Sequence, residues 1–196
     1  MNIKKKIILA SSSPRRQFLF RQIGFDFEVV PSNFEEVFDT SMSPQENALG
    51  LSKAKAFDIA EKFQNAFVVG ADTIVVLNGD IMGKPTNDSD ALLMLKKLSG
   101  REHIVYTGFT IVDRPSNKFI SEIESTAVKF RDLDQDEIIS YIKSGSPADK
   151  AGAYGIQDDY GALFVEKING CFYNVVGFPL TKFYITLKKF QSGLGK

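Results

Sequence analysis

The chain has 196 residues and balances 24 Lys and Arg against 24 Asp and Glu, so its formal net charge is zero with the single His neutral. This length suits one domain, or one domain with a lobe. Zero net charge counts against broad electrostatic binding to nucleic acid or to an anionic membrane. Hydrophobic residues make up 43% of the chain, which predicts a globular protein with a sizeable core.

Cysteine and histidine each occur once, as Cys171 and His103. An intramolecular disulfide and a Cys/His zinc site are therefore excluded, and any metal ion must be a hard cation with oxygen ligands. The apolar run after the N-terminal lysines is too short for a signal peptide. No stretch approaches the about 20 apolar residues of a membrane span. We therefore expect a cytoplasmic protein.

The chain opens with a short predicted strand at residues 6–10, a Ser-rich turn and a helix. Ser13 is a good N-cap for this helix, Pro14 suits its first position and Gly24 suits its end. A second strand is predicted at 27–30.

A capping box of Ser43 and Glu46 begins the next predicted helix, which runs to about residue 62. The continuous apolar run at 66–71 is typical of a central strand. Further apolar residues lead to Asn78, where Asn-Gly between apolar segments indicates a hairpin.

A helix is predicted at 90–99, followed by strands at 103–112 and 119–130 and a capped helix at 134–145. After a Gly-rich segment at 149–157, the pattern predicts two more strands.

These last strands lie at 162–168 and 171–176, and a final helix follows at 179–190. Strands and helices are thus mixed, with hairpins as well as βα units. We expect an α/β fold with a mixed β-sheet flanked by helices, in a single domain over residues 1–196, with a lobe around 103–145. The oligomeric state stays open, and an exposed apolar hairpin could support a homodimer.

The motif SSSPRR places polar groups where the first helix begins. A helix N-terminus attracts phosphate, and hydroxyls of Ser11 and Ser13 add donors. Arg15 and Arg16 are suited to bidentate contact with phosphate oxygens. The alternative is an ordinary capped surface helix with solvated arginines. Neither a P-loop nor a GxGxxG turn is present.

Asp72 follows the buried strand, and we expect it at the carboxyl edge of the sheet, where α/β proteins bind ligands. It is suited to bind a divalent cation or to act as a general base, although a turn-capping role is the alternative. Glu35 and Glu36 are candidates to join it at a metal, or are simply solvated. Lys84, past the hairpin, is a candidate phosphate contact or a solvated loop residue.

The Gly-rich segment at 149–157 ends in Gln157, whose amide can donate and accept at a base edge; a plain glycine-containing loop is the alternative. Together these features supply cations, an acidic metal site and a Gly-rich edge. The combination fits the handling of a polyphosphate with a magnesium-type ion.

Six motifs span nearly the whole chain: LASSSPRR (Leu9–Arg16), GADTIV (Gly70–Val75), GKP (Gly83–Pro85), LSGREHIVYTG (Leu98–Gly108), DKAGAYGIQ (Asp149–Gln157) and INGCFYNVVGFPL (Ile168–Leu180). In this order they resemble the motifs of the Maf family of nucleoside triphosphate pyrophosphatases. The resemblance implies a Maf/Ham1 (ITPase-like) fold. It also implies a cytoplasmic enzyme that hydrolyses a nucleoside triphosphate between its α and β phosphates.

The resemblance further implies roles for single residues. Asp72 matches the proposed proton acceptor. Our own hypothesis adds a Mg²⁺ or Mn²⁺ ion, with Asp72 and Glu36 as its ligands. The positions tied to substrate choice are matched by Arg15, Thr73 and Gln157. Other active-site positions are matched by Ser13, Arg16, Glu36, Lys55 and Lys84.

Within the family, SPRR, ADT and YGIQ resemble the branch that prefers dTTP and UTP rather than the branch that prefers 7-methyl-GTP. A different kind of function stays open as well, because the family takes its name from inhibition of septum formation. The protein would then be a nucleotide-binding regulator of cell division that acts through a partner. Nucleic-acid binding through the Arg pair is the weakest alternative.

Overall fold

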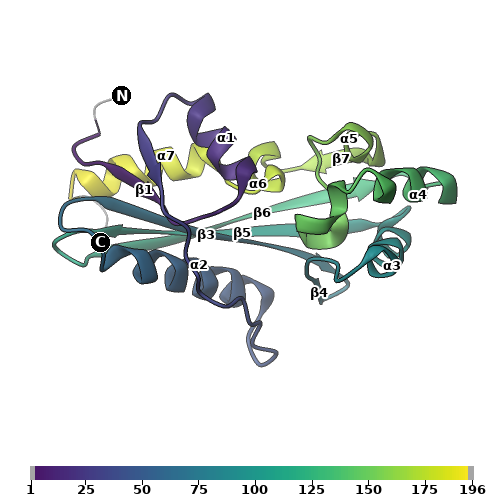
Figure 1. Ribbon diagram of the computed structural model, residues 1–196, viewed down its shortest axis with the longest axis horizontal. Coiled ribbons are helices and arrows are strands. Elements are labelled where there is room, and N and C mark those ends of the chain that lie inside the picture. Colours follow the sequence, from purple (N-terminus) through teal and green to yellow (C-terminus); the bar gives the residue numbers. More distant parts are fainter. Residues whose placement is uncertain (1–2, 194–196) are drawn as a thin grey trace. The chain divides into compact units, whose positions relative to one another are not determined.

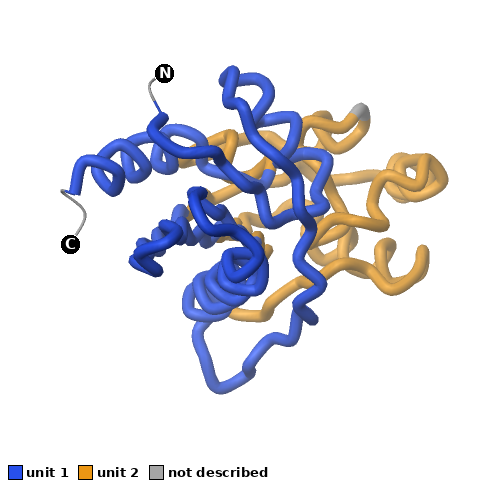
Figure 2. The backbone as a smooth tube through the Cα atoms, turned by 60° about the vertical axis from the view of Figure 1, so that its left-hand side comes forward, with its two compact units in different colours: residues 1–72, 107–124, 177–196 blue, residues 73–106, 125–176 orange. Residues whose placement is uncertain are grey.

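The computed structural model describes residues 3–193. The chain divides into two compact units (Figure 2). Unit 1 takes the residues up to Asp72, then Thr107–Glu124 and those from Gly177 onward, and unit 2 takes Thr73–Tyr106 and Ser125–Val176. Across the described residues, every helix is too short or too polar to cross a bilayer.

Strands and helices are interspersed along the chain (Figure 1). The strands are β1 (Ile7–Leu9), β2 (Phe27–Val29), β3 (Phe67–Leu77), β4 (Asp80–Met82), β5 (Glu102–Asp113), β6 (Phe119–Phe130) and β7 (Val165–Asn169). The helices are α1 (Pro14–Gln22), α2 (Pro44–Ala60), α3 (Asp88–Leu98), α4 (Gln135–Lys143), α5 (Asp159–Phe164), α6 (Phe172–Val176) and α7 (Leu180–Gln191), with 3₁₀ turns η1 (Ser146–Asp149) and η2 (Ala151–Ala153).

The strands pair in the order β2-β1-β3-β5-β6-β7, and β4 pairs with β3. β1 runs parallel to both β2 and β3, whereas β4 is antiparallel to β3 and β7 is antiparallel to β6. The sheet is therefore mixed, and helices flank it, which confirms the predicted α/β fold class.

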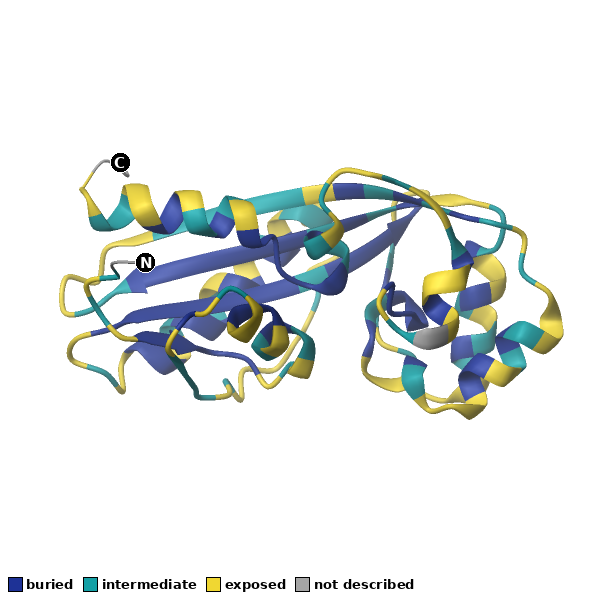
Figure 3. Cartoon of the chain, turned by 90° about the horizontal axis from the view of Figure 1, so that it is seen from above, coloured by how far each residue is buried: buried dark blue, intermediate teal, exposed yellow. Residues whose placement is uncertain are grey.

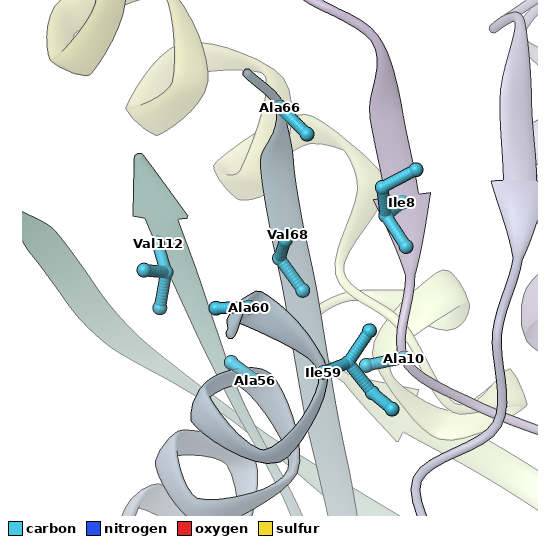
Figure 4. Close-up of a cluster of buried hydrophobic side chains, with 8 residues drawn as sticks. All are labelled: Ile8, Ala10, Ala56, Ile59, Ala60, Ala66, Val68 and Val112. Carbon is cyan, nitrogen blue, oxygen red and sulfur yellow. The ribbon is translucent and has the colours of Figure 1, made fainter. Parts of the chain in front are cut away.

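In unit 1, α2 covers one face of the strands, and α1 and α7 lie on the other (Figure 1). The α2 face is built from small and β-branched side chains, because Ile59 and its alanine neighbours pack on Ile8, Val68 and Val112 (Figure 4). Ile8, Ile59, Val68 and Val112 are all fully buried. Burial of this apolar surface contributes most of the stability of such a layer.

Phenylalanine rings fill the other face of unit 1. The ring of Phe20 on α1 lies 4.9 Å from Phe178 and 5.3 Å from Phe183, and Phe109 of β5 lies 5.7 Å from each of the same two rings. All four are fully buried. Tilted and edge-on contacts of this kind stabilise beyond simple burial, and they anchor α1 at a fixed place over the strands.

Unit 2 has its own aromatic core. His103 of β5 stands edge-on to Phe130 and to Tyr154, and Tyr141 stands edge-on to Phe164. Buried residues run along much of the long strands (Figure 3). In β3 every residue except Thr73 is buried, and the last residues of this strand belong to unit 2.

Most predicted elements are confirmed to within a few residues. The hairpin at Asn78 is among them: Asn78 and Gly79 have φ values of 54° and 93°, as a two-residue hairpin turn requires, and β3 and β4 pair across it. The strand predicted to stop at Ala71 is wrong in its end, because β3 continues to Leu77. Asp72 therefore lies inside a strand.

Of the two strands predicted near the C-terminus, the one at 171–176 is wrong and the other starts later than predicted. Phe172–Val176 form the short helix α6, where the carbonyl of Cys171 accepts from the backbone N–H groups of Asn174 and Val175. The Asn174 amide is buried and donates to the Val105 carbonyl at 2.9 Å and to Thr126 Oγ1 at 3.0 Å. The strand predicted at 162–168 begins later, because α5 occupies its first residues.

Candidate active site

Three charged side chains meet in unit 1. The Lys55 ammonium on α2 donates to Asp72 Oδ1 and to Glu36 Oε1, at 2.6 Å in both cases. The side chains of Lys55 and Asp72 are each 8% exposed, whereas that of Glu36, on the loop before α2, is 37% exposed. Lys55 and Asp72 are thus shielded from water, so each must offset the other's charge, while Glu36 leaves one side of the group exposed to solvent.

Glycine explains why α2 comes close enough for this contact. Gly70 precedes Asp72 by two residues in β3, so both face the same side of the sheet. A Cβ on Gly70 would lie 2.3 Å from the Ser52 carbonyl oxygen and 2.6 Å from the Ala56 nitrogen. These two α2 residues flank Lys55 in the helix. The missing side chain thus permits the close approach that carries the Lys55 ammonium to Asp72.

The first turn of α1 adds a buried cation. Arg16 is 9% exposed, and its guanidinium donates to the Gly177 carbonyl at 2.9 Å and to Ser11 Oγ at 3.2 Å. Ser13 is the N-cap of the helix and accepts from the Arg16 backbone N–H. Arg15 is partly exposed beside it. The predicted phosphate-binding residues therefore sit at a capped helix N-terminus, where the helix dipole is positive.

Burial and charge act against each other at Asp72. Burial raises the pKa of Asp72, because it disfavours the charged carboxylate, while the nearby positive charges of Lys55 and Arg16 lower it. Burial likewise lowers the pKa of the Arg16 guanidinium, and the charge of Asp72 opposes that shift. A carboxylate whose pKa is perturbed in this way is typical of a functional site.

Two carboxylates that reach one point also suit a small cation. Asp72 and Glu36 approach the same ammonium nitrogen, so a hard divalent ion with oxygen ligands fits their donor set. Across residues 3–193, no group of three or more His, Cys, Asp or Glu side chains is arranged to hold a metal ion. Magnesium commonly takes only one or two protein carboxylates and completes its shell with water and phosphate oxygens.

The remaining predicted site residues lie in unit 2. Thr73 is the half-buried residue of β3, next to Asp72 in sequence, and Lys84 is exposed on the loop after β4. Gln157 is exposed between η2 and α5, and its amide nitrogen donates to Asp158 Oδ1 at 2.9 Å. The sequence motifs predict no role for Asp158, although an acidic residue next to Gln157 could have indicated a hydrogen-bond partner for its amide.

Known proteins similar to this chain were found both by a family model and by sequence. The family model described as Maf-like protein matches residues 6–190. A dTTP/UTP pyrophosphatase of Caldicellulosiruptor saccharolyticus is 45% identical, over 98% of each chain. Another, from Carboxydothermus hydrogenoformans, is 49% identical over 94% of this chain and 98% of its own. A third, from Dictyoglomus turgidum, is 45% identical over 98% of this chain and its own full length.

Among solved structures, a HAM1 protein from Coxiella burnetii is similar over 96% of this chain and 99% of its own, with a TM-score of 0.51 and 13% identity. At that identity the similarity supports the fold alone. It agrees with the mixed sheet and flanking helices described above.

Proposed function

The chain belongs to the Maf family, and from this we propose that it is a nucleoside triphosphate pyrophosphatase that hydrolyses dTTP and UTP to the monophosphate and pyrophosphate. One observation supports a location for this activity: Lys55 and Asp72 form a buried ion pair, which the partly exposed Glu36 joins, close to Arg16. A cytoplasmic location goes with this proposal, since nucleoside triphosphates are made and used there.

In the proposed reaction, a water oxygen attacks the α-phosphorus, the bond to the bridging oxygen breaks, and pyrophosphate leaves. Asp72 takes up the proton of the attacking water, for which a carboxylate with a raised pKa is suited. Arg15 and Arg16, at the N-terminus of α1, offset the negative charge of the phosphates, as does Lys84.

Glu36 and Asp72 would hold the Mg²⁺ or Mn²⁺ ion that the family uses, and the bound ion would supply positive charge next to the phosphates. Lys55 is 2.6 Å from both carboxylates. We infer that it orients the two side chains and keeps their negative charges together. Gln157 and Thr73 would contact the base, in line with the family positions for substrate choice.

The test is pyrophosphate release from dTTP, UTP, CTP, 7-methyl-GTP and inosine triphosphate, with Mg²⁺ or Mn²⁺ and with a chelator. We expect dTTP and UTP to be the best substrates and the chelator to abolish turnover. Asp72→Asn removes the proton acceptor and should lower kcat by about 100-fold or more. Asp58→Asn is the matched control, because Asp58 is exposed on α2 and accepts only a contact from Ser32 at 2.7 Å among the side-chain bonds described.

Near-normal turnover by Asp72→Asn would contradict the proposed role of Asp72. A preference for 7-methyl-GTP would keep the chemistry and overturn the choice of branch. If the wild-type protein hydrolyses no triphosphate, the enzyme proposal fails, and a role as a nucleotide-binding regulator gains weight.

A further inference from the structure

The carboxylate of Asp158 is the meeting point of several donors in unit 2. Its Oδ1 accepts from the Gln157 amide nitrogen at 2.9 Å. Its Oδ2 accepts from Ser146 Oγ at 2.6 Å and lies 3.0 Å from the Lys150 ammonium. The Tyr141 hydroxyl also points at Oδ2, at 3.4 Å. Gln157 is therefore held by a carboxylate that is itself tied down.

The surroundings leave this carboxylate little freedom. Lys150 is 8% exposed, so water cannot readily replace Asp158 as a partner of its ammonium group. The Tyr141 hydroxyl accepts from the Gly155 backbone N–H at 3.0 Å. A Cβ on Gly155 would lie only 2.4 Å from Asp158 Oδ2, so the loop backbone closes around the acid. Asp158 is thus a fixed point next to an exposed side chain.

A fixed carboxylate determines which way the Gln157 amide faces. An ionised carboxylate only accepts hydrogen bonds, and an amide has a donating and an accepting end. The NH₂ group must therefore face Asp158, because the flipped amide would place its oxygen against the carboxylate. The Oε1 atom consequently keeps one position relative to the loop.

We propose that Asp158 is a positioning residue that holds Gln157 in the orientation that recognises uracil and thymine rather than cytosine. This rests on the proposed function, in which Gln157 contacts the base. Uracil and thymine present an N3–H donor beside an O4 acceptor, whereas cytosine presents an N3 acceptor beside an N4–H₂ donor. An amide that can flip suits both patterns, and an amide fixed in one orientation suits only one.

The experiment measures kcat/KM for UTP and for CTP and compares their ratio among variants. Asp158→Asn keeps the size of the side chain but can donate as well as accept, so it allows Gln157 to flip. We expect the UTP/CTP ratio to fall by about ten-fold, the lower range for loss of a hydrogen bond to a charged group. Asp149→Asn is the matched control: Asp149 also binds Lys150, at 2.9 Å, and its side chain is 54% exposed.

A double variant separates positioning from a general structural effect. On a Gln157→Ala background, Asp158→Asn should leave the UTP/CTP ratio unchanged, because the residue through which it acts is gone. A merely structural role would lower kcat/KM for both nucleotides alike and leave the ratio as it was in every background.

The inference is overturned if Asp158→Asn leaves the ratio of an active enzyme unchanged, if Asp149→Asn lowers it equally, or if Asp158→Asn lowers it just as much without Gln157. Failure of the proposed function has a different signature, because the wild-type protein would then release no pyrophosphate from UTP.

Discussion

Replacing Gly70 with alanine tests whether the close approach of α2 to β3 sets the geometry of the Asp72–Lys55 pair. The added Cβ would lie 2.3 Å from the Ser52 carbonyl oxygen, and 3.0 Å is the least that real Cβ contacts show. The helix must therefore retreat from 2.3 to 3.0 Å, that is by 0.7 Å. Both close atoms, on Ser52 and Ala56, belong to the backbone, so no side chain can turn away to relieve the contact.

Overpacking of this kind costs about 1–3 kcal/mol, and we expect Gly70→Ala to reach the upper part of that range. The movement also carries Lys55 away from Asp72, since Ser52 and Ala56 flank it in the helix. We therefore expect Gly70→Ala to lower pyrophosphate release from UTP as well as stability.

The control is Gly50→Ala in the same helix. Gly50 is exposed, and an added Cβ would have no atom within 4 Å. Alanine is preferred over glycine inside a helix by about 1 kcal/mol, so this variant should be more stable than the wild type and fully active. Urea unfolding with a linear extrapolation gives both free energies. A Gly70→Ala protein as stable as the wild type would refute the argument from close approach.

Two further predictions concern buried ionisable groups. Lys55→Met removes the ammonium beside Asp72, and breaking a buried pair costs about 3–5 kcal/mol of stability. Because burial raises the pKa of Asp72, its protonation relieves part of this loss at low pH. Urea unfolding should therefore show a larger loss of unfolding free energy at pH 8 than at pH 5, and an equal loss would contradict this. Burial lowers the pKa of His103 to about 4, below its ordinary value near 6.5, so protonation favours the unfolded chain and stability should fall as the pH drops from about 6.5 to 4, by up to about 3 kcal/mol. His103→Gln should lack that part of the pH dependence. If the unfolding free energy of the variant and of the wild type falls equally between pH 6.5 and 4, the prediction is refuted.

Local signals predicted much of the fold. The capping box of Ser43 and Glu46 marks the start of α2, and Asn78 with Gly79 marks the hairpin, because caps and turns depend on neighbours within a few residues. The end of β3 was mispredicted because an Asp-Thr pair resembles the close of a strand. An ammonium group on α2 pairs with the buried Asp72 carboxylate, and a partner that lies 17 residues away leaves no signal in the residues next to the aspartate.

For the candidate site too, the sequence predicts some features and only the structure shows others. The motif resemblance predicts Arg16, Lys55 and Asp72 as site residues, and the structure brings the last two into direct contact. It could not show that Arg16 is held by the Gly177 carbonyl, because a backbone acceptor far along the chain has no side-chain signature. Similarly, the local pattern predicts a strand where α6 lies, because the bonds that hold the Asn174 amide come from the distant strands β5 and β6.

The two units differ in their optical properties. The chain has no tryptophan and six tyrosines, and Tyr184 on α7 is the tyrosine of unit 1, while Tyr106, Tyr141, Tyr154, Tyr160 and Tyr173 belong to unit 2. Unit 1 is instead packed with phenylalanine rings around Phe20. Tyrosine emission in a Tyr184→Phe protein would therefore report on unit 2 alone, and near-ultraviolet dichroism of the phenylalanine bands would weight unit 1. Followed together in one denaturant titration, the two signals tell whether the units melt in one cooperative step or in succession.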